Sequence, residues 1–136
     1  MTRQEIYREM QESFGLVPSF FEALPDDVLE HDWNVFKVLE GQEGTLGLKE
    51  KNLIGLGIAA AIKCRYCTLF HTEMARAHGA SDEEIHEALR YAMNTAGWST
   101  FLNGIQLDFE KFKNELFKIQ EYVGKKAEKE AARMAM

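Results

Sequence analysis

Three side chains capable of redox and acid–base chemistry stand close together in one segment. Cys64 and Cys67 are three residues apart, and His71 follows four residues after Cys67. A thiolate is a nucleophile, and an imidazole exchanges protons near neutral pH. On a helix, which turns about 100° per residue, Cys67 lies about 60° and His71 about 20° from Cys64. The spacing therefore predicts a redox dithiol with its own proton carrier on one helix face.

The same three residues allow two other interpretations. Two thiolates and an imidazole are a plausible zinc triad, but structural zinc takes four ligands, and His31 and His86 are distant in the sequence. Alternatively, the cysteines are small apolar core residues beside a satisfied histidine. The shared face favours the redox interpretation over both, so we expect no metal and no cofactor other than a redox-active disulfide between the two cysteines.

The role of His71 can be predicted by comparing the rate gain from lowering a thiol pKa with the gain from proton transfer. Lowering a thiol pKa by two units raises the thiolate fraction about 25-fold but lowers intrinsic reactivity about eightfold, a net gain of about threefold. A positioned proton carrier contributes about 10²–10⁴-fold. His71 is therefore predicted to carry a proton to the leaving sulfur or oxygen. A helix N-terminus, or His71 if it takes the proton, would lower the pKa of a thiol in this segment, and Lys63 and Arg65 flank Cys64 and would favour a thiolate by charge.

Composition excludes several classes of function. The chain has 136 residues, 46% of them hydrophobic, and a formal net charge of −6, which fits one globular domain over residues 1–136. The negative charge argues against nucleic acid and anionic membrane surfaces as partners. The N-terminus does not resemble a secretory signal, and the longest apolar run, residues 53–62, is shorter than the roughly 20 residues that a bilayer crossing needs. We expect a cytoplasmic protein.

Helical periodicity dominates the chain, and no strand pattern with a period of two is found. Helices are predicted at residues 6–14, 26–40 and 48–62, with a short helical turn in the proline-containing connector between the first two. The cysteine segment forms the next helix, and Gly79 ends it. Ser81 and Glu84 should form a capping box for the following helix, which the segment NTAGWSTFLNG is expected to bend or interrupt. A last helix runs through Val123, before a charged tail that frays. The prediction is an all-α single-domain bundle of about six helices, which disfavours a thioredoxin fold.

The segment EKNLIGLGIAAAIKCRYCTLFHTEMARAHGASDEEIHEAL resembles the core of the carboxymuconolactone decarboxylase superfamily, over residues 45–105. It is most similar to the alkylhydroperoxidase-D-like (AhpD-like) branch. An apolar helix, C-x-x-C-x-x-x-H and GAS-x-EEI-x-EAL together carry the resemblance. It implies an all-helical homo-oligomer, a trimer or hexamer. The cysteine pair would reduce a peroxide or disulfide substrate, and a thiol or dithiol reductant, protein or small molecule, would restore it.

The resemblance also implies roles for individual residues. Cys67 would be the attacking thiolate beside His71, and Cys64 the resolving thiol. The family places a glutamate where this chain has Asn52, which can orient an imidazole but cannot carry a proton as a carboxylate does. Asn52 could equally cap backbone near the start of its helix. Tyr66 could line the pocket or donate to a substrate oxygen. We therefore favour thiol–disulfide oxidoreductase activity, with peroxide reduction impaired.

Two non-redox functions remain open at this stage. One is a carboxymuconolactone decarboxylase-like enzyme, and the other is a non-catalytic oligomeric binding protein. The substitution Cys67→Ser should spare either of them and abolish redox turnover.

Overall fold

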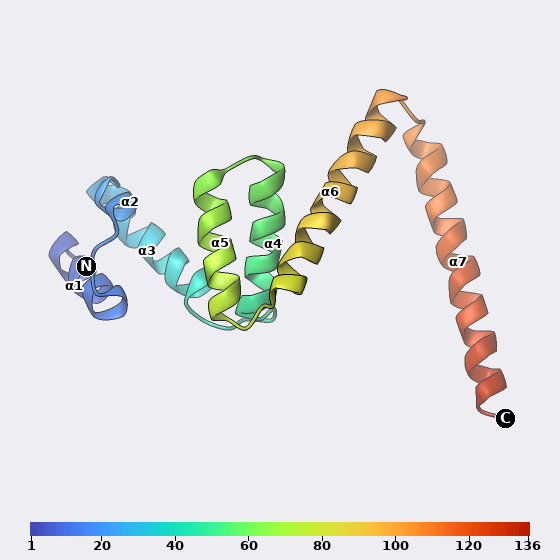
Figure 1. Cartoon of the computed structure of the whole chain (residues 1–136), viewed down its shortest axis with the longest axis horizontal. Helices are drawn as coiled ribbons and strands as arrows, with labels where there is room; N and C mark the ends of the chain where they lie inside the picture. The colour runs from blue at the N-terminus through green and yellow to red at the C-terminus, as the bar shows by residue number, and fades with distance from the viewer. The chain divides into compact units, whose positions relative to one another are not determined.

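The computed structural model describes residues 1–136 and contains seven helices and no strand (Figure 1). The all-helical prediction is confirmed, and the connector turn accounts for one helix more than expected. Two compact units divide the chain, Met1–Ala92 and Met93–Met136. None of the helices has both the length and the apolar composition that a bilayer crossing requires. The helices are α1 Arg3–Phe14, α2 Ser19–Glu22, α3 Asp26–Glu40, α4 Leu48–Ala61, α5 Arg65–Ala77, α6 Asp82–Gly104 and α7 Phe109–Met134.

The first three helices form a small core of their own. Thr2 caps α1 in a capping box with Glu5, and prolines precede α2 and α3, where a missing N–H costs no helical hydrogen bond. The indole of Trp33 meets the ring of Phe21 edge-on, with centroids 5.5 Å apart. The buried members of this core are Ile6, Met10, Phe21, Leu29 and Trp33.

Helices α4 and α5 lie side by side and carry the predicted site (Figure 1). Two glycines of α4 allow neighbouring helices to approach closely, as the sequence predicts. At Gly57 an added Cβ would meet the Cβ of Ala92 in α6 at 3.6 Å, an ordinary contact. At Gly55 an added Cβ would lie only 2.5–2.7 Å from ring atoms of His71. A second buried cluster holds α4, α5 and α6 together through Leu56, Ala75, Ala80 and Ile85.

The predicted boundary between α5 and α6 is confirmed. Gly79 adopts a φ of +90° after α5, a left-handed conformation that glycine adopts without a Cβ clash. Ser81 and Glu84 form the capping box, with both hydrogen bonds at 3.0 Å.

Two predictions for the C-terminal part are wrong. Helix α6 continues through NTAGWSTFLNG without a break, and the Thr100 and Asn103 side chains donate to carbonyl oxygens four residues earlier. The charged tail does not fray, because α7 extends to Met134. Alanine, glutamate and lysine are strong helix formers, and Lys125 pairs with Glu121 one turn earlier at 2.8 Å.

Candidate redox site

Cys64 occupies the cap position of α5 rather than a place within the helix. Its φ of −90° and ψ of 104° are extended, and α5 begins at Arg65, so placing Cys64 on the helix was wrong. The cysteine sulfur takes the role that serine or aspartate oxygen usually has at this position. The backbone N–H of Cys67 donates to Cys64 Sγ at 3.2 Å. The hydroxyl of Thr68 donates to the Cys64 carbonyl oxygen at 2.8 Å and fixes the first turn.

The pKa values of the two thiols are shifted in opposite directions. A hydrogen bond from the Cys67 thiol lowers the pKa of Cys64, and the backbone N–H of Cys67, with a smaller contribution from that of Tyr66, lowers it further. The same contact raises the pKa of Cys67, because its proton is held between the sulfurs, and burial raises it further. The N–H hydrogen bond to Cys64 Sγ at the start of α5 favours the same distribution, with negative charge on Cys64.

Asn52 fixes the orientation of the His71 ring. Its amide Nδ2 donates to the Leu48 carbonyl oxygen at 2.8 Å, and its Oδ1 lies 2.9 Å from His71 Nδ1. A carbonyl oxygen can only accept, so the amide nitrogen must face Leu48 and Oδ1 must face the ring. Nδ1 of His71 therefore carries the hydrogen, and Nε2 keeps its lone pair. Asn52 is fully buried, and it holds the imidazole with one end of its amide while the other end donates to a carbonyl of the first turn of α4.

Gly55 and Phe70 hold the same ring in place. The imidazole lies against Gly55, where there is no room for a Cβ, and Phe70 contacts it edge-on at 5.1 Å between centroids. The His71 ring is hydrogen-bonded to Asn52 Oδ1, and it has no hydrogen bond to the sulfur of Cys64 or Cys67. Proton transfer between His71 and Cys67 therefore needs an intervening water or substrate atom. We had not predicted Gly55 as a site residue, although it follows Asn52 by three residues on the same helix face.

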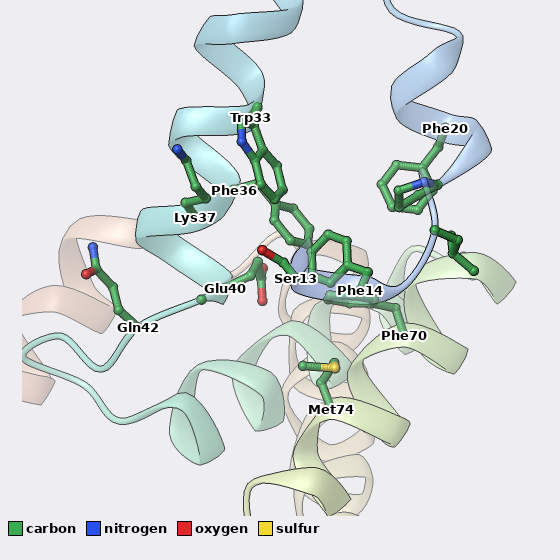
Figure 2. Close-up of a pocket in the computed structure, with 13 residues that line it drawn as sticks. Ser13, Phe14, Phe20, Trp33, Phe36, Lys37, Glu40, Gln42, Phe70 and Met74 are labelled. Carbon is green, nitrogen blue, oxygen red and sulfur yellow. The ribbon is translucent and has the colours of Figure 1, made fainter. Parts of the chain in front are cut away.

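An aromatic pocket of about 680 Å³ opens beside this site, and neither Cys64 nor Cys67 lines it (Figure 2). Rings from α1, α2 and α3 gather on one side of it, and Phe70 and Met74 of α5 complete the wall. Trp33 contributes an edge to this wall although it is a core residue with 1% of its surface exposed. The pocket is lined by Ser13, Phe14, Leu16, Pro18, Phe20, Trp33, Phe36, Lys37, Glu40, Gly41, Gln42, Phe70 and Met74.

A second concavity, a shallow groove of about 560 Å³, does contain Cys64. We call it the Cys64 groove, and it is lined by Ala60, Lys63, Cys64, Arg65, Thr68, Leu69 and Thr72. At 100° per residue, its members from α5 lie nearly opposite Phe70 and Met74 on that helix. Tyr66 lines neither concavity, is 74% exposed, and accepts a 3.4 Å hydrogen bond from Arg65.

The structure contains no set of side chains that matches the zinc interpretation. No three or more histidine, cysteine, aspartate or glutamate side chains are grouped so that they could hold a metal ion.

Comparison with known proteins places the fold and the family. The family model described as carboxymuconolactone decarboxylase matches residues 22–107. The crystal structure of the alkylhydroperoxidase AhpD core from Rhodospirillum rubrum is similar, with a TM-score of 0.69 and 24% identity over 80% of this chain and 84% of that one. A second crystal structure, of a Thermotoga maritima protein, gives a TM-score of 0.48 and 25% identity over 85% and 95% of the two chains. A search of curated proteins found no match.

Proposed function

Because the chain belongs to the carboxymuconolactone decarboxylase family and has an AhpD-like fold, we propose that it is a thiol–disulfide oxidoreductase. The pair Cys64 and Cys67 cycles between dithiol and disulfide. The observation that carries the proposal is the hydrogen-bonded pair at the start of α5, in which one sulfur is set up to ionise and the other to donate.

The electrostatics of the pair favour Cys64 as the first nucleophile, the reverse of the order that the family resemblance implies. The Cys64 thiolate attacks one sulfur of a substrate disulfide, forms a mixed disulfide and releases the first substrate thiolate, which takes a proton from solvent. Cys67 then attacks Cys64 Sγ and releases the second thiolate. The substrate gains two electrons and becomes two thiols, and the pair becomes a disulfide that a thiol or dithiol reductant restores.

His71 serves the second step. As Cys67 attacks, its proton passes through a water to Nε2 of His71, the nitrogen whose lone pair the contact with Asn52 leaves free. The imidazolium then returns this proton to the departing thiolate. Asn52 acts as a positioning residue and moves no proton itself. Peroxide reduction would use the same sulfurs, but it lacks the carboxylate of the family pattern and is proposed to be the weaker activity.

Mass spectrometry tests this proposal directly. The reduced protein is treated with one equivalent of hydroxyethyl disulfide or of an organic hydroperoxide and digested. We expect the loss of two hydrogen atoms and a bond between Cys64 and Cys67. If both thiols stay inert to both oxidants, the redox function is excluded.

Trapping tests the order of attack. Cys67→Ser should accumulate a stable mixed disulfide at Cys64, because serine still donates to Cys64 but cannot resolve the intermediate. Cys64→Ser should react slowly with the same disulfide. Faster trapping at Cys67 would restore the order that the resemblance implies.

The aromatic pocket is the one observation that favours a non-redox function, because an apolar ligand bound there would contact neither sulfur. Under this alternative, ligand binding or turnover would survive Cys67→Ser. Loss of all activity in that variant would exclude it.

We further propose that the protein is a homo-oligomer, a trimer or hexamer as the family resemblance implies. Large apolar side chains of α7 are exposed at helical spacing and need a partner surface: Phe109, Phe112, Leu116, Ile119 and Val123. A reducing compartment such as the cytoplasm would keep the cysteine pair in its dithiol form. Sedimentation analysis tests the assembly, and a monomer at all concentrations would contradict it.

A further inference from the structure

We propose that Cys64 exchanges preferentially with small disulfides that carry carboxylates, because it lines a groove with two cations outside any ion pair and no acidic residue. This inference rests on the proposed function and names its substrate class. Nothing in the family resemblance or in the cysteine spacing specifies a charge for the substrate.

The charge of the Cys64 groove is opposite to that of the chain as a whole. Lys63 and Arg65 flank Cys64, and no acidic residue lines the groove, although the protein carries a net charge of −6. Neither cation takes part in any of the ion pairs of the structure. Both are therefore available to an incoming carboxylate.

Both cations are adjacent to Cys64 in the sequence and line the same groove. Lys63 has a φ of +61° in the turn that joins α4 to α5, a left-handed conformation uncommon for a residue with a side chain. The Arg65 guanidinium lies 5.2 Å from the centroid of the Tyr66 ring. The ring of Tyr66 therefore contacts Arg65 from outside the groove.

A carboxylate needs these cations more than a neutral substrate does. The attacking Cys64 sulfur is a thiolate, which repels an approaching anion. Two cations that line the same groove oppose this repulsion, and positive clefts raise the local concentration of an anionic substrate. The groove volume of about 560 Å³ lies within the range of small-molecule sites, so we choose a small disulfide as the proposed substrate.

The exchange step balances without another reactant. The Cys64 thiolate forms an S–S bond with one substrate sulfur, the substrate S–S bond breaks, and a carboxylate-bearing thiolate leaves. Cys67 displaces the remaining half and gives up its proton through His71. The dithiol is oxidised to a disulfide, and the substrate is reduced to two carboxylate-bearing thiols.

Three disulfides of similar size test the inference: anionic dithiodipropionate, neutral hydroxyethyl disulfide and cationic cystamine. The rate of formation of the Cys64–Cys67 disulfide with each is divided by the rate of the same reagent with a neutral model thiol. We expect the normalised rate to rise about three- to tenfold from the neutral to the anionic reagent and to fall by a similar factor for the cationic one. The differences should shrink in high salt. Equal normalised rates would overturn the inference.

Charge variants locate the effect. Lys63→Gln with Arg65→Gln should remove most of the preference, and Arg65→Gln alone provides a milder variant should the turn at Lys63 not tolerate the double change. Lys118→Gln in α7 removes one positive charge elsewhere and is the control for net charge. The groove would have no such role if the preference for the anionic disulfide fell equally in Lys118→Gln, or if it survived in the double variant.

An alkylation assay separates this inference from the proposed function. In Cys67→Ser, Cys64 is the single thiol, and its reaction with iodoacetate and iodoacetamide needs no redox cycle. We expect the ratio of the iodoacetate rate to the iodoacetamide rate to exceed that of the model thiol by about three- to tenfold. If no Cys64–Cys67 disulfide forms but this ratio is raised, the redox function fails and the anion-selective groove stands. An unraised ratio overturns the inference whether or not the disulfide forms.

Discussion

The unit Met1–Ala92 and the unit Met93–Met136 use apolar residues in different ways. The first contains two buried clusters, and within it Cys64 contacts Cys67 and Asn52 contacts His71. The second has no buried residue, although Trp98, Phe101 and Phe112 belong to it. The comparison teaches that the candidate redox residues all belong to the first unit, whereas the second unit exposes the apolar stripe of α7 that we propose as an assembly surface. Chemistry and assembly should therefore respond to different substitutions.

The largest expected effect is on chemistry alone. Cys64→Ser or Cys67→Ser should lower steady-state disulfide reduction by about 10³-fold or more, because exchange needs a thiolate and closure of the cycle needs the second sulfur. Turnover with a disulfide substrate and a dithiol reductant measures the loss. Sedimentation and circular dichroism should be unchanged, since neither cysteine lies in a buried cluster. A variant that loses its assembly together with its activity would break the comparison.

The next effect is on assembly alone. Leu116→Glu places a charge in the apolar stripe of α7 and should weaken self-association by about 10²-fold, because a buried interface does not tolerate an unpaired charge. Sedimentation across a concentration series measures this, with Glu115→Gln, one residue away on the same helix, as the matched control. Alkylation of Cys64 in the Leu116→Glu variant should keep the wild-type rate. A change in that rate would mean that α7 or a second copy contributes to the site.

Two glycines of α4 provide a sharper test within the first unit. Gly55→Ala places a methyl group where the His71 ring lies, so we expect the free energy of unfolding to fall by about 1–3 kcal/mol. We also expect thiol–disulfide exchange to slow about tenfold, because the ring is displaced from Asn52. Gly57→Ala is the control, because its Cβ meets Ala92 at an ordinary 3.6 Å. Helix propensity should stabilise this control by up to about 1 kcal/mol. Thermal unfolding and the pH profile of exchange distinguish a misplaced ring from simple destabilisation, and equal behaviour of the two variants would contradict the account.

Restoring a carboxylate beside His71 has the smallest expected effect. Asn52→Glu should raise peroxide reduction about fivefold relative to disulfide exchange, since a carboxylate stabilises the imidazolium that protonates the leaving oxygen. It should also lower stability, because Asn52 is fully buried and the amide contact with Leu48 is lost. Parallel assays with an organic hydroperoxide and a disulfide measure the ratio, and Asn52→Gln controls for side-chain length. An unchanged ratio would mean that the missing carboxylate does not limit the peroxide activity.

Local sequence patterns were sufficient for most of the fold. The Ser81 capping box, the Gly79 turn and the small residues of α4 each specify a contact within a few residues or with one neighbouring helix. The family pattern supplied the pairing of Asn52 with His71, and the structure contains a 2.9 Å contact between them, while the roles of the site residues stay predictions. It did not identify Gly55, because the close approach of a ring to a glycine depends on how two helices pack and not on either sequence alone.

The remaining errors have physical causes. The expected break in α6 and the expected fraying of α7 do not occur. Gly97 and Gly124 lie in these segments, but each costs a helix only about 1 kcal/mol, which a long helix absorbs. The position of Cys64 at the cap could not be read from the C-x-x-C spacing, which is compatible with a cysteine inside or just before a helix. This one-residue difference decides which sulfur accepts the helix N–H groups, and hence which sulfur ionises first.

Peptide-resolved alkylation of the reduced wild-type protein across a pH series tests the central claim most directly. Because the contact between the sulfurs lowers the pKa of Cys64 and raises that of Cys67, the rate at Cys64 should rise and level off at lower pH than that of an ordinary thiol. The rate at Cys67 should rise only at higher pH. In Cys67→Ala, which removes the donor, the profile of Cys64 should move back towards higher pH. Modification of Cys67 before Cys64, or two identical profiles, would contradict the account.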